Sequence, residues 1–337
     1  MDVRIIRARK IFGDGRHNAF TGIGAGFGRT YVAFRSGSTH MSVDGGIRVI
    51  GSGDLETWGG VLHLSHPDAD LRDPKLAFFG GKLRLYFAHR ERKAPRRMMT
   101  MESGNGLDFG APVAVRGIPE GHWLWHAREH GGVLYGTAYG RAERGGHEVA
   151  LYSSGDGTEW SLRAALPVPG NETPLDFDAD GTLWALVRDD FADNVPTLCS
   201  AKPPYARFDS ARRLPMRMQG PMLKRLRGGC VAIGRQWDGP GWRNLRTDAF
   251  WIGDGDEPRR ICTLPSGGDT SYADWLDVAE GRAAVSYYSS HEHCMDEEHG
   301  GEAVFPRMRG EEKASMAADV YLAEVSYAEE KEEMGRD

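Results

Sequence analysis

Six glycines recur about 50 residues apart along this chain, and each lies in a short turn between two apolar segments. The six are Gly28, Gly81, Gly132, Gly181, Gly229 and Gly281. A chain of 337 residues could hold two domains on length alone. An even period over the whole sequence instead favours one repeat architecture, in which residues at the same distance from each glycine occupy equivalent places.

The sequence around each glycine has the pattern of a strand, a tight turn and a second strand. Residues 73–89 and 275–289 illustrate it, with alternating apolar residues on both sides of Gly-Gly or Glu-Gly. A second turn begins at Ser52, Ser103 and Ser154, where Gly and then Asp or Asn follow and an aromatic residue ends the turn. We expect the Asp or Asn to accept backbone N–H bonds while the aromatic ring packs back onto the strand.

Four strands in each of six repeats predict an all-β fold, a six-bladed β-propeller with four-stranded antiparallel blades. The last repeat has only three strands of its own, ending at 318–325, and a strand at Val3–Arg9 would complete it and close the ring. We therefore expect one domain over 1–327 and a charged tail over 328–337. An open solenoid and a pair of β-sandwiches are the alternatives.

Composition limits the partners. The net charge is −6, so nothing favours nucleic acid or an anionic membrane. The first ten residues lack the apolar stretch of a secretory signal, and no segment is long enough to span a membrane. Four cysteines lie far apart, without the spacing of a metal site or a disulfide framework. We expect a cytoplasmic protein without a cofactor or resident metal; the sequence leaves its oligomeric state open.

The serine turns resemble the Asp-box of BNR repeats, which occurs in sialidases and in other propellers. Longer segments add to the resemblance: Asn171-Glu172 is followed by Arg188, and Ser271-Tyr272 precedes a hairpin of the same kind. Together with residues 17–20, 33–40, 71–76, 220–223, 267–272 and 286–292, they resemble a set of bacterial sialidase-like propellers of unestablished substrate. The resemblance implies that Tyr272 is a nucleophile, that Glu172 is its base and that Arg188 binds substrate.

One segment departs from the sialidase pattern. Sialidases carry their first substrate arginine in an R-I-P motif of the first blade, where this chain has residues 17–20, His-Asn-Ala-Phe. The aspartate that serves sialidases as an acid has no clear counterpart either, and Asp44 and His40 are only nearby. A complete three-arginine clamp for a carboxylate is therefore not expected.

The repeat itself places residues around a central pocket, without reference to any family. In a propeller, residues before the first strand of each blade and after the second strand meet on one face. Nine residues before each glycine lie Ala19, Arg72, Trp123, Glu172, Gly220 and Tyr272, and six or seven after it lie Arg35, Tyr139, Arg188, Arg235 and Tyr288. We therefore expect substrate contacts from Arg35, Arg72, Arg188, Arg235 and Tyr139. We add Trp125 as a surface on which a sugar can stack, His17 of the first repeat, and His291, which follows the last hairpin toward the same face.

These residue types suit an acidic sugar. Arginine binds a carboxylate or sulfate in fork geometry and keeps its charge at any working pH. Tyrosine is a poor nucleophile near its ordinary pKa, so it needs a base such as Glu172. The leaving oxygen also needs an acid, for which Asp73, Asp44 and His40 compete.

Each assignment has a structural alternative. Arginine is the common cation of this chain, so a single one could belong to an ion pair between blades. Trp125 could be core between blades, and Asp73 precedes a proline as turn residues often do. Residues 291–299 combine histidines, a cysteine and carboxylates, but their irregular spacing fits a solvated loop better than a metal site.

The sequence thus predicts an exo-acting glycoside hydrolase for an acidic sugar, sialidase-like in layout, with a glycan or small acidic sugar as its partner. A polysaccharide lyase that acts on uronate-containing glycans is one alternative. A glycan-binding propeller without catalysis is the other.

Overall fold

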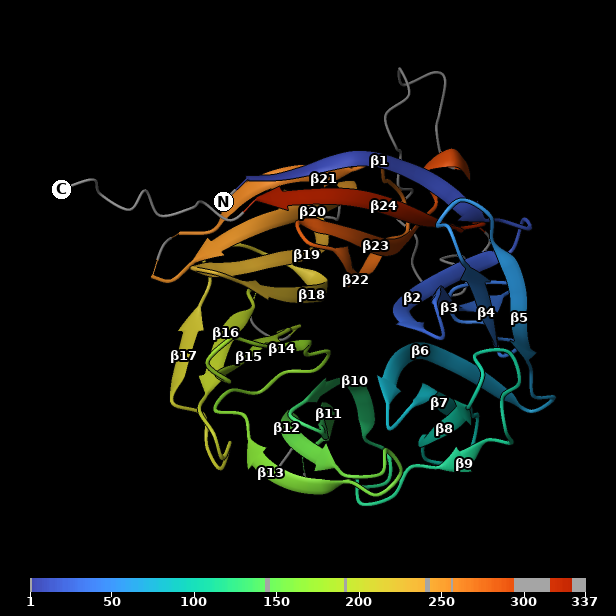
Figure 1. The fold of residues 1–337 in the computed structure, drawn as a ribbon, viewed down its shortest axis with the longest axis horizontal. Coiled ribbons are helices and arrows are strands. Elements are labelled where there is room, and N and C mark those ends of the chain that lie inside the picture. Colours follow the sequence, from blue (N-terminus) through green and yellow to red (C-terminus); the bar gives the residue numbers. More distant parts are fainter. Residues whose placement is uncertain are drawn as a thin grey trace.

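The structure is a computed structural model that describes residues 2–142, 146–190, 193–239, 243–255, 257–293 and 316–328. The chain forms six four-stranded antiparallel sheets arranged as blades around a central axis, a six-bladed β-propeller (Figure 1). This confirms the predicted fold class. The only helical segment among the described residues is one short 3₁₀ turn, η1 (His291–His293).

Strands follow the chain from the axis outward in blades 1 to 5. Blade 1 contains β2 (His17–Gly26), β3 (Arg29–Gly37), β4 (Gly46–Ser52) and β5 (Gly59–Leu64). Blade 2 contains β6 (Ala69–Phe79), β7 (Lys82–Glu91), β8 (Arg97–Ser103) and β9 (Val113–Ala114). Blade 3 contains β10 (Trp123–His130), β11 (Val133–Arg141), β12 (His147–Ser154) and β13 (Ser161–Ala165). Blade 4 contains β14 (Leu175–Phe177), β15 (Leu183–Val187), β16 (Thr197–Ala201) and β17 (Ser210–Arg213). Blade 5 contains β18 (Gln219–Leu226), β19 (Gly229–Asp238), β20 (Arg243–Gly253) and β21 (Arg259–Leu264).

Blade 6 joins the two ends of the described chain. Its strands are β22 (Thr270–Ala279), β23 (Arg282–Ser289), β24 (Asp319–Ala328) and, outermost, β1 (Asp2–Phe12). β1 pairs antiparallel with β24, in a register that sets Val3 opposite Tyr327 (Figure 1). Arg9 Nη1 also donates to Glu324 Oε1 at 2.7 Å between these strands. The predicted closure of the ring by the N-terminal strand is confirmed, while the tail beyond residue 328 lies outside the described residues.

The turns have the predicted chemistry, with one correction. Gly28 and Gly81 have φ of +71° and +72°, the left-handed conformation that a tight hairpin requires and glycine adopts without strain. In blade 5 this conformation belongs to Gly228, at φ +76°, while Gly229 is already the first residue of β19. In the second turns, Asp156 Oδ1 accepts from the backbone N–H groups of Thr158 and Glu159, both at 2.8 Å.

A β-bulge recurs near the start of the inner strands. It interrupts the pairing between the first two strands of blades 1, 2, 5 and 6, each time with one extra residue on the inner strand, so that two residues there lie opposite one on the partner. At the bulge, Phe20, Asp73, Gly220 and Tyr272 all have positive φ, between +49° and +61°. A bulge re-aims the side chain that it carries. The repeated bulge therefore directs one residue from each of these blades in an equivalent manner.

The bulges show that counting nine residues back from the hairpin glycine gives the wrong equivalent residue in blades 1 and 2. Phe20 and Asp73, rather than Ala19 and Arg72, are the equivalents of Tyr272. The bulged residue lies eight positions before the hairpin glycine in blades 1 and 2. Nine positions were correct in blade 5 only because Gly229 was counted in place of Gly228, and in blade 6 because β22 contains a second irregularity between Asp277 and Ala279.

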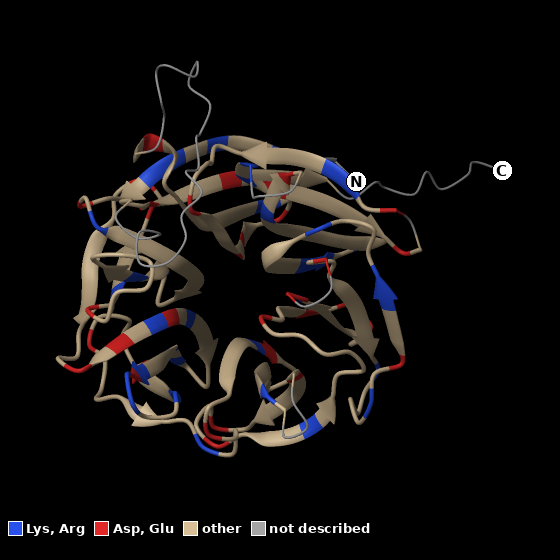
Figure 2. Ribbon diagram, turned by 180° about the vertical axis from the view of Figure 1, so that it is seen from behind, with Lys and Arg blue, Asp and Glu red and all other residues tan. Residues whose placement is uncertain are grey.

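The outer surface carries both signs of charge. Segments of Lys and Arg and of Asp and Glu are interspersed around the ring (Figure 2). Among the described residues, no helix is long and apolar enough to cross a membrane.

Candidate functional site

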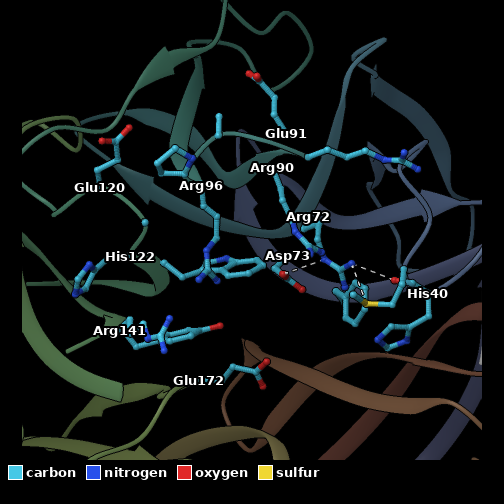
Figure 3. Close-up of a pocket in the computed structure, with 18 of the residues that line it drawn as sticks. His40, Arg72, Asp73, Arg90, Glu91, Arg96, Glu120, His122, Arg141 and Glu172 are labelled. Atoms are coloured by element: carbon cyan, nitrogen blue, oxygen red, sulfur yellow. Dashed lines mark hydrogen bonds and ion pairs between the residues drawn. The ribbon is translucent and has the colours of Figure 1, made fainter. Parts of the chain in front are cut away.

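A cavity of about 930 Å³ opens on the face of the ring where the bulged ends of the inner strands meet (Figure 3). Side chains from blades 1, 2, 3, 4 and 6 line it. Glu172 and Tyr272 form one wall, Arg72, Asp73 and His40 lie beside them, and residues of blades 2 and 3 form the far side. The cavity is large enough for a ligand of several rings.

Tyr272 and Glu172 are in direct contact, although they come from blades 6 and 4. The Tyr272 hydroxyl donates to Glu172 Oε1 at 2.8 Å. Arg188 Nη1 donates to the other oxygen of Glu172 and lies 3.1 Å from the Tyr272 hydroxyl. One guanidinium thus bridges the carboxylate and the phenol, an arrangement that holds a hydroxyl, a proton acceptor and a fixed cation together.

The Tyr272 ring is held by its backbone and its neighbours. Its own φ is +50°, and a Cβ added at Gly220 would lie 3.0 Å from the ring carbons Cδ2 and Cε2, so a larger residue there would press on the ring. Phe20 packs edge-on at 5.0 Å between ring centroids, and Trp125 at 5.6 Å. Left-handed backbone in a residue other than glycine costs energy that the surrounding packing must offset. The ring is therefore fixed at this place.

The electrostatics of Tyr272 oppose spontaneous ionisation. Burial raises the pKa of Tyr272 well above its ordinary value, and the carboxylate of Glu172 raises it further. Arg188 and Arg235 lower the pKa but do not offset the burial. The phenol is thus neutral at neutral pH, and it can act as a nucleophile only when Glu172 accepts its proton during the attack.

Arg235 lies behind the Tyr272 ring, with its guanidinium carbon 5.8 Å from the ring centroid. Its Nε donates to the carbonyl of Thr270 at 2.8 Å, and its Nη2 donates to Asp269 Oδ1 and to the Tyr288 hydroxyl, both at 3.0 Å. Arg235 is consequently near Tyr272 and Glu172, but most of its donors are already engaged by protein groups.

Asp269 also joins two histidines. Its Oδ2 lies 2.8 Å from His17 Nε2 and 2.5 Å from His40 Nδ1. Burial opposes ionisation of Asp269, but His40, His17 and Arg235 outweigh it and hold the pKa of this carboxyl well below its usual range. The ligand atoms of the three residues lie within 4.8 Å of one another, yet Arg235 already neutralises the carboxylate, which disfavours a divalent cation there. The contacts instead fix the His40 ring at the cavity wall.

Arg72 and Asp73 belong to the bulge of blade 2 and line the cavity. The Arg72 guanidinium lies over the Phe20 ring, 4.8 Å from its centroid, and its Nη1 donates to Asp70 Oδ2 and the His40 carbonyl, both at 3.1 Å. Burial raises the pKa of Asp73 to about 6, against the lowering effect of Arg72. Asp73 is therefore a carboxyl group that retains a proton in weakly acidic solution, in the same cavity as Tyr272 and Glu172.

Arg35 does not reach the cavity, contrary to the sequence-based expectation. It is completely enclosed: its Nε donates to Asp70 Oδ1 at 2.7 Å, its Nη1 to the Thr39 carbonyl at 2.9 Å and its Nη2 to the Ser42 carbonyl at 2.7 Å. Gly45 packs against this pair, where any side chain would collide with it. Arg35 is thus an ion-pair partner between blades 1 and 2.

Other predicted contacts are also displaced from the cavity. Trp125 lies beneath Tyr272 with the Lys75 ammonium 5.2 Å from its ring, so it supports the site and offers no open face to a sugar. His17 is buried behind His40. His291 packs against Tyr321 and accepts or donates a hydrogen bond with Ser289 at 2.9 Å, away from the cavity-lining set. Tyr139 does line the cavity, stacked parallel to Trp123.

Asp44, the further acid considered from the sequence, caps a turn. Its Oδ1 accepts from the Ser38 backbone at 3.0 Å, and its Oδ2 pairs with Arg16 at 2.7 Å. Most of the loop 291–299 that was considered for a metal site lies outside the described residues.

Sequence reasoning missed the arginines on the far side of the cavity. Arg90, Arg92, Arg96 and Arg141 line it together with Glu91 and Glu120. A signal existed: Arg90 and Arg141 both lie nine residues after a hairpin glycine, two positions beyond the count that was used. The second strands of blades 2 and 3 extend further toward the cavity face than that count assumed.

Fold and site together define a six-bladed propeller whose central cavity holds a tyrosine–glutamate pair among arginines. No protein-family model matches the chain, and no curated protein matches it. Among solved structures, a Dyadobacter fermentans protein of unknown function is similar with a TM-score of 0.78 and 15% identity, over 97% of this chain and 99% of that one.

Sialidases are also among the similar structures. The phage phi92 endosialidase has a TM-score of 0.68 at 10% identity, over 98% of this chain and 70% of that chain. The Trypanosoma rangeli sialidase in complex with the inhibitor DANA has a TM-score of 0.63 at 11% identity, over 91% of this chain and 55% of that chain. At these identities the likeness establishes a sialidase-like propeller fold and leaves the catalytic residues to the site itself.

Proposed function

We propose that this protein is an exo-acting glycoside hydrolase for an acidic sugar, with Tyr272 as the nucleophile and Glu172 as its base. The observation that carries the proposal is the 2.8 Å hydrogen bond from the Tyr272 hydroxyl to Glu172 in a cavity lined by arginines. A tyrosine nucleophile suits an anionic sugar, because a carboxylate nucleophile would be repelled by the substrate's own charge. The glycosidases among the similar structures support the same class.

Three arginines around Tyr272 support an acidic substrate. Arg188 and Arg235 contact the tyrosine, and Arg72 approaches it across the Phe20 ring. Arg72 would thus serve where the first-blade arginine of sialidases is missing. Among the described residues, Arg72 Nη2, Arg188 Nη2 and Arg235 Nη1 have no hydrogen-bond partner. Arg72 lines the cavity and keeps this donor for a substrate carboxylate, while Arg188 and Arg235 lie behind the lining and add positive charge next to Tyr272.

The reaction would proceed in two displacements. In the first, the Tyr272 oxygen attacks the anomeric carbon while its proton passes to Glu172, and the leaving oxygen departs with a proton from Asp73. In the second, water attacks the same carbon and gives its proton to Asp73. Tyr272 is then released as the phenol, with the proton returned by Glu172.

The first test is turnover of fluorogenic 4-methylumbelliferyl glycosides of acidic monosaccharides, with the corresponding neutral glucoside as the control. We expect release of the fluorophore from at least one acidic glycoside and none from the neutral one. Equal release from both would overturn the acidic-sugar assignment, and no release from any would overturn the hydrolase.

The role of Asp73 predicts a pH dependence. Because burial raises its pKa to about 6, the protonated form falls as the pH rises above that value, and kcat/KM for an alkyl glycoside should fall with it. Asp73→Asn should lower kcat by about 10²–10⁴-fold and remove this limb of the profile. A 4-methylumbelliferyl leaving group needs less protonation, so the same variant should be far less impaired on it. Equal losses on both leaving groups would contradict the role.

A polysaccharide lyase is the second candidate, and His40 favours it. His40 lines the cavity, and Asp269 holds its Nδ1 at 2.5 Å, which leaves Nε2 as the face available to a ligand. Burial lowers the pKa of His40, so the ring is neutral at neutral pH and can accept a proton. A lyase product absorbs in the ultraviolet through its new carbon–carbon double bond, whereas a hydrolase product does not. Binding without either product would indicate a glycan-binding propeller.

A further inference from the structure

The far side of the cavity carries an excess of positive charge that the proposed chemistry does not use. Arg90, Arg92, Arg96 and Arg141 face only two carboxylates there, Glu91 and Glu120. Figure 3 shows Arg90 and Arg96 above the cavity, with Glu172 on the opposite side, and Arg141 on the side of His122. These arginines come from the ends of β7 and β11 and from the loop after β7, so two blades contribute to one positive surface.

Little within the described residues neutralises this charge. Arg90 and Arg141 both pair through their backbones in their strands, but neither guanidinium has a hydrogen bond or ion pair with a described residue. Glu91 is engaged elsewhere, with its Oε1 at 3.6 Å from His89 and 3.8 Å from Arg97. Like charges gathered at one wall without counter-charges are unfavourable, and an anion between them removes that cost.

Arg96 is the member of this surface whose side chain stacks on an aromatic ring. Its guanidinium stacks over Trp123 at 4.7 Å from the ring centroid, and Trp123 in turn lies parallel to Tyr139 at 6.1 Å. Burial and the neighbouring Arg90 and Arg72 lower the pKa of Arg96, which reflects how closely the cations are placed. The stack fixes the guanidinium plane, and a fixed plane is what bidentate binding of an oxyanion requires.

We propose that this side of the cavity, formed by Arg90, Arg96 and Arg141, is a second subsite that binds an oxyanion on the leaving-group portion of the glycan. This assignment rests on the proposed function, because only a glycan that is cleaved has a leaving-group portion. It names the substrate class as a glycan with anionic groups on two neighbouring sugars, either two carboxylates or a carboxylate and a sulfate. The cavity volume of about 930 Å³ is in keeping with more than one sugar ring.

The test is calorimetric binding of three uncleaved probes by the full chain: trigalacturonate, a heparin-derived tetrasaccharide and neutral cellotriose. We expect one of the two anionic probes to bind, with an affinity that falls steeply as salt is raised, and cellotriose to bind at least tenfold more weakly. The two anionic arms distinguish carboxylate from sulfate as the group that is recognised.

The double variant Arg90→Gln/Arg141→Gln should lower the affinity for the anionic probe by about 10- to 100-fold, since each substitution removes a charge-assisted contact. Arg259→Gln is the matched control, because Arg259 is an exposed arginine on the outer strand β21, and it should change binding less than twofold. Circular dichroism checks that the double variant folds. Unchanged binding by the double variant, equal binding of cellotriose, or no binding of either anionic probe would overturn the proposal.

Turnover separates this subsite from the proposed function. In the double variant, kcat/KM for 4-methylumbelliferyl glycosides of acidic monosaccharides should fall much less than the affinity for the anionic probes, since these substrates carry no second anionic sugar. If no glycoside is cleaved while trigalacturonate or the heparin fragment still binds through Arg90 and Arg141, the hydrolase fails and the anionic subsite stands.

Discussion

Tyr272→Phe should lower kcat on acidic 4-methylumbelliferyl glycosides by about 10³-fold or more, because it removes the attacking oxygen and leaves the rest of the site in place. The phenylalanine ring can occupy the same place against Gly220, Phe20 and Trp125. Arg188 and Glu172 still pair with each other, so no charge is left alone. Substrate binding should therefore persist, as measured by calorimetry with the unreacted glycoside.

Tyr288→Phe is the matched control for this loss. Tyr288 is a buried tyrosine of the same blade, and its hydroxyl lies 2.8 Å from Asp269 and 3.0 Å from Arg235 rather than at Glu172. It should retain activity within about tenfold of wild type, as expected for the loss of one supporting hydrogen bond. If the Tyr272 variant kept more than a tenth of the wild-type kcat, a tyrosine nucleophile would be ruled out, and His40 would become the group to test.

Arg35→Ala should destabilise the protein by about 3–5 kcal/mol, the range for breaking a buried ion pair by removing one partner. Asp70 is 3% exposed and would lose its 2.7 Å contact, while the carbonyls of Thr39 and Ser42 would lose their donors. Chemical denaturation followed by tryptophan fluorescence measures the free energy of unfolding.

The control for Arg35 is Arg207→Ala, at an exposed arginine 3.4 Å from Asp209, which should cost less than about 1 kcal/mol. If Arg35→Ala had the wild-type free energy of unfolding but bound the acidic glycoside more weakly, Arg35 would be a substrate-binding residue and not a structural ion-pair partner.

The fold could be predicted because its signals are local. Each hairpin depends on a glycine and on alternating residues around it, and repetition then determines the ring. The Glu172–Tyr272 pair was found by the same count, although the two residues belong to different blades. Position within a repeat therefore predicts which residues converge at the axis.

Orientation could not be predicted in this way. Arg35 and Arg188 occur at the same distance from their glycines, yet Arg35 is enclosed and Arg188 reaches the Tyr272 hydroxyl. The difference depends on Asp70 of the next blade and on the space that Gly45 leaves beside it. Such neighbours come from distant parts of the sequence, so no count along one repeat reveals them.

The bulges limited the prediction at the level of single residues. They add residues to the inner strands, so Asp73 rather than Arg72 became the equivalent of Tyr272. Nothing in the alternation of apolar residues marks a bulge before the partner strand is known.

The strand pairing of blade 6 has a consequence for how the site is assembled. The sheet that carries Tyr272 takes its outermost strand, β1, from the opposite end of the described chain from β24. Contacts between such distant segments form slowly, and a chain emerging from the ribosome must extend through β24 before β1 can pair with it. Glu172, in blade 4, is synthesised and placed earlier. The blade that carries Tyr272 is thus completed after the blade that carries Glu172.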